Sequence, residues 1–151
     1  MIYCCESPVG PLALSYDASG CVTGLGFGRP DTWDPDAPES VRQVCSQLSR
    51  YFETGAAISL ASCELRKRTD FQQRVSRVVC AIPPGQTLEY REVAAHAGSP
   101  RGARAVGNVM ASNPWPIIVP CHRVVATQGL GGYTGGLESK RWLLAHEQSC
   151  S

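Results

Sequence analysis

The stretch NPWPIIVPCHRVV, residues 113–125, places a thiol beside an imidazole and a guanidinium at Cys121-His122-Arg123. Its first two prolines end any preceding helix, and the apolar run 117–119 is typical of a short buried segment leading to the cysteine. A thiolate is a strong nucleophile, and a neighbouring histidine can take the thiol proton. Adjacent residues of a strand point to opposite faces, so contact between Cys121 and His122 would need a turn or a bridging water.

Two short helices separated by a glycine-containing turn are expected before this stretch, at 90–96 and 100–112. Ser99 is the expected N-cap of the second helix, with Pro100 at its first position. The pair has the size of a helix-turn-helix. On the second helix, Arg101, Arg104 and Asn108 would share one face. Helical hairpins of this kind are also common in proteins that bind no nucleic acid.

Further helices flank this region. A capping box at Thr69-x-x-Gln72 predicts a helix that ends before Pro83, and the last helix is expected at 137–146.

The first half has the pattern of a small antiparallel sheet. Alternating apolar residues predict a strand at 12–16, and the turn signal at 17–20 leads into a second strand at 21–27. Residues 2–5 are expected to add a third strand.

An amphipathic helix should follow at 41–52 and stop at Gly55, before a short extended piece at 58–65. The basic triplet 66–68 marks the expected boundary. We therefore predict an α+β fold with two domains. Residues 1–66 would form a scaffold of a small antiparallel sheet with a helix. Residues 67–151 would form a helical domain with a winged-helix-like helix-turn-helix.

Composition bounds the class of protein. The chain has 151 residues, 43% hydrophobic and 18% charged, which is typical of a globular protein. It lacks an apolar run of about 18 residues and a secretory signal at its start, so we expect no membrane association and a cytoplasmic location, or a nuclear one in a eukaryote. Most of the eight cysteines are then expected to be free thiols.

Charge is distributed unevenly. Residues 1–64 carry three basic against eight acidic side chains, whereas residues 65–151 carry eleven against five. Residues 93–137 contain no acidic side chain but include Arg101, Arg104 and Arg123. Such a segment can face a polyanion without repulsion, so together with the helix-turn-helix it favours DNA as the partner.

The strings at 113–125, GYTGGL at 132–137 and WLLAHE at 142–147 resemble those of the O6-alkylguanine-DNA alkyltransferases. EYREVA at 89–94 and ARAVG at 103–107 fit the same family in order and spacing. The resemblance covers about residues 70–147. In the first half only the order of hairpin then helix fits.

The resemblance implies direct-reversal DNA repair. Cys121 would irreversibly accept a methyl or other alkyl group from O6-alkylguanine in duplex DNA, and O4-alkylthymine is a second substrate that the sequence leaves open. Because a thioether has no easy route back to a thiolate, each molecule should work once. The family needs no cofactor, and we expect a monomer.

The same resemblance implies individual roles. In the reaction, His122 would take the thiol proton through a water, Glu147 would orient the imidazole, Asn113 would brace the site, and Tyr90 would donate a proton to the guanine. The nucleotide would be flipped out, with Arg104 filling its place from a helix in the minor groove, whose small residues suit a narrow groove. The expected DNA contacts are Arg104, Tyr90, Ala103, Ala105, Gly107, Arg101 and Arg123. The expected base pocket is Met110, Val124, Tyr133, Thr134 and Gly135, with Thr134 where many relatives carry serine.

Some members of the family hold a structural zinc ion through two cysteines and two histidines of the N-terminal domain. Here all three histidines lie in the second half, so we expect no metal. A site of four cysteines, drawing on Cys4 or Cys5, Cys21, and Cys63 or Cys80, stays open.

Three other functions are compatible with parts of the sequence. An alkyltransferase-like protein could bind the lesion without chemistry, but such proteins replace the acceptor cysteine, and Cys121 is present. A helix-turn-helix transcription factor would need base-reading side chains and a dimer seam. A cysteine–histidine hydrolase would turn over repeatedly, whereas an alkyltransferase stops after one equivalent.

Overall fold

The structure, a computed structural model, describes residues 1–61 and 63–150. The chain divides into two compact units, Met1–Leu65 and Arg66–Ser151. Among the described residues, no helix is both long and apolar enough to cross a bilayer.

The first unit contains a three-stranded antiparallel sheet in the order β1-β2-β3, which confirms the three predicted strands. The strands are β1 (Ile2–Cys5), β2 (Leu12–Tyr16) and β3 (Val22–Phe27). Alternate residues of β2 are buried because side chains of a strand point to opposite faces. In the β2–β3 turn, Asp17 Oδ1 accepts hydrogen bonds from the N–H groups of Ser19 and Cys21.

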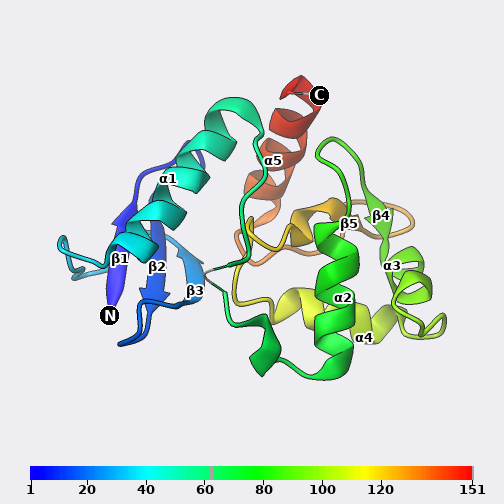
Figure 1. The fold of residues 1–151 in the computed structure, drawn as a ribbon. Coiled ribbons are helices and arrows are strands. Elements are labelled where there is room, and N and C mark those ends of the chain that lie inside the picture. Colours follow the sequence, from blue (N-terminus) through cyan, green and yellow to red (C-terminus); the bar gives the residue numbers. More distant parts are fainter. Residues whose placement is uncertain (62, 151) are drawn as a thin grey trace. The chain divides into compact units, whose positions relative to one another are not determined.

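The helix α1 (Glu39–Thr54) runs across the sheet of this unit (Figure 1) and buries Val41, Val44, Leu48 and Tyr51. It ends where Gly55 adopts a left-handed φ of 75° and donates its N–H to the Tyr51 carbonyl, as the sequence predicted. A disulfide joins Cys5 of β1 to Cys45 of α1. Among the described residues, Cys4, Cys21, Cys80, Cys121 and Cys150 are free thiols, as expected for most of the eight cysteines.

The second unit is mainly helical. Its helices are α2 (Asp70–Cys80), α3 (Tyr90–His96), α4 (Ala103–Ala111) and α5 (Leu137–Cys150). The predicted capping box begins α2, since Thr69 and Gln72 exchange side-chain and backbone hydrogen bonds. The helices α3 and α4 pack together as the helix-turn-helix, and α2 packs on both (Figure 1).

Two short elements tie this unit together. The strands β4 (Leu88–Glu89) and β5 (Val124–Val125) form a parallel pair that the sequence analysis missed, because two residues carry no periodicity. The pair joins the start of α3 to the segment that follows Cys121. The short 3₁₀ helix η1 (Leu65–Lys67) precedes α2.

The predicted start of the fourth helix was wrong. Ser99 accepts the Gly102 N–H at 2.8 Å in a turn, and Gly102 rather than Ser99 occupies the N-cap position of α4. Pro100 therefore lies within the turn instead of opening the helix. Arg101 precedes α4, so it does not share a helical face with Arg104 and Asn108.

Two other boundaries differ. The last helix continues four residues beyond the predicted end, to Cys150. The predicted extended piece at 58–65 includes residue 62, which lies outside the described residues. Among its described residues, Cys63 forms a single bridge with Val22, and Leu65 begins η1.

Candidate active site

A braced loop leads from α4 to Cys121. Asn113 donates from Nδ2 to the Val119 carbonyl and accepts the Trp115 N–H at Oδ1, both at 3.0 Å. The Val119 N–H donates to the Trp115 carbonyl at 2.8 Å, which closes the turn. Within it, Ile117 has a φ of 75°, a left-handed conformation that costs about 1–2 kcal/mol. The surrounding hydrogen bonds hold this strained turn, so the approach of the chain to Cys121 is fixed.

The sequence suggested that Cys121 lies on an extended strand, and this was wrong. Cys121 begins a 3₁₀ turn, η2 (Cys121–Arg123). Pro120 has φ −77° and ψ 65°, and the Cys121 N–H donates to the Val119 carbonyl at 2.7 Å, which is an inverse γ-turn. Because proline fixes φ near this value, the extended run ends there. The structure therefore supplies a turn, but Nδ1 of His122 has no hydrogen-bond partner among the described residues, so the turn alone does not bring the thiol into hydrogen-bond contact with the ring.

The Cys121 thiol is buried, with only 4% of the residue exposed. Burial raises its pKa, and this outweighs the opposing effects of a hydrogen bond from Asn113 and the positive charge of Lys140. The resting side chain is therefore a thiol at neutral pH, and nucleophilic attack requires a base that accepts its proton.

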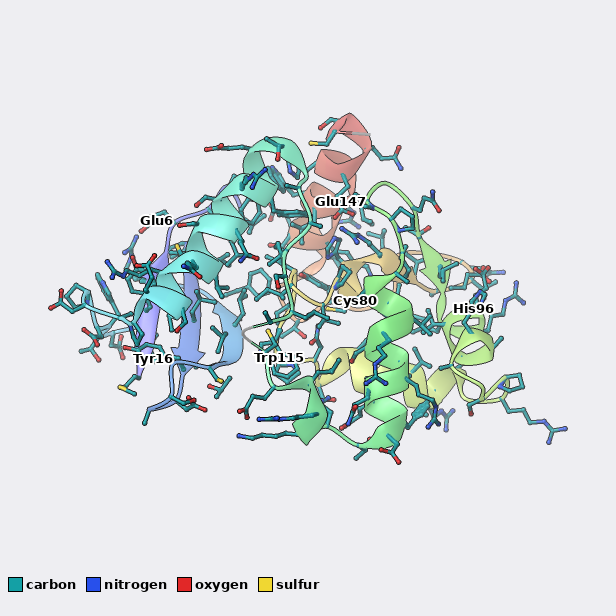
Figure 2. The ribbon with its side chains drawn as sticks, in the orientation of Figure 1. Glu6, Tyr16, Cys80, His96, Trp115 and Glu147 are labelled. Carbon is teal, nitrogen blue, oxygen red and sulfur yellow. A yellow bond between two sulfur atoms is a disulfide. The ribbon has the colours of Figure 1, made fainter. Side chains whose placement is uncertain are left out.

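His122 is the adjacent candidate base. Its Nε2 lies 2.8 Å from Oε2 of Glu147, which projects from α5 (Figure 2), and both side chains are fully buried. Burial is the largest effect on its pKa and lowers it, so the ring is neutral. A neutral ring beside a carboxylate carries its proton on Nε2, which leaves Nδ1 as the acceptor. Nδ1 is buried and has no hydrogen-bond partner among the described residues.

The structure contradicts the prediction that Arg123 contacts DNA. Its side chain is 9% exposed, and its guanidinium pairs with Glu147 through Nε and Nη2. Nη1 donates to the Ile82 carbonyl at 2.7 Å. The sequence analysis placed this arginine on the surface because charge alone does not distinguish a phosphate contact from a buried ion pair.

Lys140 is a buried residue that the sequence analysis missed. Its Nζ donates to the carbonyls of Val124, at 2.8 Å, Gly132, at 3.1 Å, and Leu130. The three ammonium hydrogens are thus matched by three acceptors. Lys140 therefore connects β5 to the glycine-rich loop. Its spacing of seven residues from Glu147, which places both on one face of α5, was the available signal.

A cavity of about 360 Å³ opens at Cys121. It is lined by Tyr90, Gly107, Met110, Ala111, Cys121, Gly132, Tyr133 and Thr134. Of the expected base pocket, Met110, Tyr133 and Thr134 line this cavity. Val124 and Gly135 are not among its lining residues, and the Val124 carbonyl accepts from Lys140.

The exposed side of α4 carries the other expected DNA contacts. A shallow hollow is lined by Ala103, Arg104 and Gly107 of α4, together with Tyr90. Arg104 and Ala105 are exposed, as is Arg101 in the preceding turn. The hollow and the cavity share Tyr90 and Gly107, so the face of α4 is continuous with the opening at Cys121.

Gly131 is a position where we expect a side chain to impair the site. It has a φ of 72°, and a Cβ there would lie 2.7 Å from the Tyr90 hydroxyl. Gly131→Ala should displace Tyr90 from the cavity wall and slow reaction at Cys121 by about 10- to 100-fold, because small misplacements around a reacting group are costly. The control is Gly10→Ala, which shares the positive φ but meets open space. Equal rates for both variants, measured with the substrate that the resemblance implies, would contradict this expectation.

Lys140 should make stability depend on pH. Burial lowers its pKa from 10.5 to about 8. Between these values the unfolded chain binds a proton that the folded chain has lost, so this residue makes the free energy of unfolding rise with pH. The difference in that free energy between the wild type and Lys140→Met should therefore grow from about pH 8 to pH 10 in urea titrations. A constant difference over this range would refute the assignment.

One potential metal-binding group occurs among the described residues. Asp17, Cys21 and Glu64 of the first unit each offer a ligand atom within 4.8 Å of the others. This group contains no histidine, so it differs from the set of two cysteines and two histidines that some members of the family use. Among the described residues, no four cysteines come together as a possible metal site.

Comparisons with known proteins agree with one another. Residues 70–149 match the family model of the 6-O-methylguanine DNA methyltransferase DNA-binding domain. The chain is 37% identical to the human methylated-DNA–protein-cysteine methyltransferase over 94% of this chain and 77% of that protein. Its identity with the protein of that name from Mycobacterium tuberculosis is 42%, over 95% of this chain and 90% of that protein.

Solved structures show the same relationship. The crystal structure of Mycobacterium tuberculosis OGT in complex with DNA matches with a TM-score of 0.80 and 37% identity, over 99% of this chain and 94% of that one. The methyltransferase of the archaeon Pyrococcus kodakaraensis, at 24% identity and a TM-score of 0.64, shares the fold.

Fold and site together define an α+β protein with a helix-turn-helix and a buried cysteine–histidine–glutamate group at its cavity. The chain belongs to the 6-O-methylguanine DNA methyltransferase family. This confirms the resemblance found in the sequence and the expected fold class.

Proposed function

We propose that this chain repairs DNA directly by moving a methyl or other alkyl group from O6 of guanine to Sγ of Cys121. The observation that carries the proposal is the placement of Cys121 in the wall of the cavity, next to a neutral His122 with a free acceptor nitrogen. The name of the human and mycobacterial relatives, methylated-DNA–protein-cysteine methyltransferase, supports it.

The proposed step is a displacement at the alkyl carbon. The Cys121 proton passes to Nδ1 of His122 through a water, and Glu147 stabilises the resulting imidazolium. Sγ forms a bond to the alkyl carbon while the bond from that carbon to O6 breaks. The electron pair of the broken bond stays on the guanine. The product is a thioether, so each molecule acts once and needs no cofactor.

Tyr90 is the proposed proton donor to the leaving base. Burial raises the pKa of its phenol, so it stays protonated at neutral pH. It lines the cavity with Cys121, and its hydroxyl has a hydrogen bond with the Gly132 backbone. This places an acid within the same cavity as the nucleophile, which lets the guanine leave as a neutral base.

Duplex DNA is the proposed partner, bound through α4 in the minor groove with the target nucleotide flipped into the cavity. The mycobacterial structure in complex with DNA supports this partner. Gly107 and the alanines at 103 and 105 have small side chains or none, so this face of α4 can fit into a narrow groove. We further propose that residues 67–151 carry DNA binding and chemistry, residues 1–66 act as a scaffold, and the protein works as a monomer.

Arg104→Ala should reduce repair of duplex DNA. Arg104 is exposed at the hollow on α4, and we expect its side chain to occupy the space left by the flipped nucleotide. Without it the flipped state loses about 1–3 kcal/mol, so transfer from a duplex should slow about 10- to 100-fold. Transfer from the free base O6-benzylguanine should change little. Arg141→Ala, at an exposed position of α5, is the control, and equal loss on both substrates would count against this role.

The proposed function is tested by mixing the reduced protein with a duplex that carries one O6-methylguanine labelled in its methyl group. Intact mass and peptide mapping should show one methyl group on Cys121, reaching one equivalent and then stopping. Binding without a mass gain would replace the proposal with a lesion-binding protein. Repeated turnover would replace it with a hydrolase.

A further inference from the structure

Arg123 is a buried charge that the proposed reaction does not use. Its guanidinium meets Glu147 in a forked pair, with Nε 2.9 Å from Oε1 and Nη2 2.8 Å from Oε2. Oε2 is the same oxygen that lies 2.8 Å from Nε2 of His122. The third arm, Nη1, is anchored on the Ile82 carbonyl just beyond α2. One side chain thus joins η2 to α5 and to the end of α2.

This arrangement restricts the carboxylate. A glutamate held only by His122 could rotate about its terminal bond and offer either oxygen. The fork removes that freedom, since each Glu147 oxygen already accepts from a guanidinium nitrogen. With the carboxylate held in this way, Nε2–H of His122 donates to Oε2 at 2.8 Å, and Nδ1 is directed away from Glu147.

The charge of Arg123 has a second consequence. An unscreened buried carboxylate would favour the imidazolium form of His122, which has no free acceptor nitrogen. Glu147 indeed raises the pKa of His122, whereas burial, Arg123 and Lys140 lower it. The other groups near the ring are Cys121 on its own turn and the Tyr133 ring, edge-on at 6.3 Å. Cys80 of α2 faces Arg123 and has its pKa raised to about 11 by burial, so it adds no charge at neutral pH.

We propose that Arg123 is a positioning residue for alkyl transfer, which fixes Glu147 in orientation and keeps His122 neutral with Nδ1 ready to accept the Cys121 proton. The proposal rests on the proposed function. Arg123, which the sequence analysis expected to contact DNA, would instead control the protonation state of the general base His122.

Nitrogen-15 NMR of the wild-type imidazole is the first test, because it needs no variant. His122 should be the Nε2–H tautomer at neutral pH and should stay neutral below its ordinary pKa of 6.5, because burial lowers the pKa of the ring. An Nδ1–H tautomer, or protonation at the ordinary value, would overturn the proposal.

The variant test compares Arg123→Met with Arg123→Lys. In Arg123→Met the His122 titration should move up by about one pH unit or more, and methyl transfer near pH 7 should slow about tenfold. Arg123→Lys keeps the charge, so the titration midpoint should stay near that of the wild type. A rate loss with an unchanged midpoint in Arg123→Met would show a merely structural role and overturn the proposal.

If Arg123→Met fails to fold, the double variant Arg123→Met with Glu147→Gln is tested instead, because it removes both buried charges. In that variant His122 should lose its fixed Nε2–H tautomer. Retention of a pure Nε2–H tautomer would overturn the proposal. Failure of the proposed function has a different signature, since the wild type would then leave Cys121 without a methyl group.

Discussion

Cys121→Ser should abolish alkyl transfer, with a rate loss of at least about 10³-fold. A serine hydroxyl has nearly the same shape, but it ionises far less readily than a thiol, and its oxygen is a poorer nucleophile towards an alkyl carbon. Ionisation of residue 121 is already unfavourable in this site, because burial raises the pKa of Cys121 above the ordinary value of a thiol. The variant should still fold and bind alkylated duplex DNA, since Asn113 and the turn at Pro120 are untouched.

The measurement is the mass of the protein after incubation with a duplex that carries labelled O6-methylguanine. Cys150→Ser is the matched control, because Cys150 is the exposed thiol of the same unit and would report any unspecific alkylation. It should take up one methyl group as the wild type does. Label on Cys121→Ser at any other cysteine would contradict the assignment of the acceptor.

Glu147→Gln should cost the protein about 3–5 kcal/mol of unfolding free energy. The substitution keeps the shape of the side chain but leaves the buried guanidinium of Arg123 without its counter-charge. It also removes the carboxylate that stabilises protonated His122, so alkyl transfer should slow even in the folded fraction.

Urea unfolding at neutral pH measures this effect. Glu138→Gln is the control on the same helix, because Glu138 is exposed in the first turn of α5 and its charge contributes at most about 1 kcal/mol there. Similar losses for both variants would show that the buried pair does not hold the end of α5 in place. A loss of unfolding free energy in Glu147→Gln alone would support a structural role for the Arg123–Glu147 pair in addition to its role in the reaction.

The two predictions distinguish an effect on the reaction rate from an effect on the stability of the fold. Cys121 is expected to affect the reaction and leave stability nearly unchanged, since a hydroxyl replaces a thiol of similar volume. Glu147 is expected to affect both, because it is shared between His122, the proposed base, and Arg123, which also bonds to the Ile82 carbonyl just beyond α2.

Local pattern was sufficient for much of the fold and for the family. The alternation of Leu12, Leu14 and Tyr16, the capping box at Thr69 and the stop at Gly55 each depend on contacts within a few residues, so they could be read directly from the chain. The motif around Cys121 likewise identified the family, because its residues are adjacent in the sequence.

The start of α4 was harder to predict, since Ser99 and Pro100 fit two local structures equally well. A serine before a proline can open a helix, or it can accept a hydrogen bond in a turn. The contact between Ser99 and Gly102 selects the turn. The parallel pairing of Leu88 with Val124 was also hidden, because the two residues are far apart in the chain and each strand has only two residues.

The sequence alone determined the class of fold and the family, and it singled out Cys121 and His122 as the proposed acceptor and base, because short-range pattern and the motif itself carry that information. Only the tertiary structure decided where the charges of Arg123 and Lys140 go. A basic residue is usually exposed, and whether it is buried depends on a carboxylate or a set of carbonyls brought from other parts of the chain. Burial of those groups, and the pKa shifts that follow from it, arise only when α5 packs against η2.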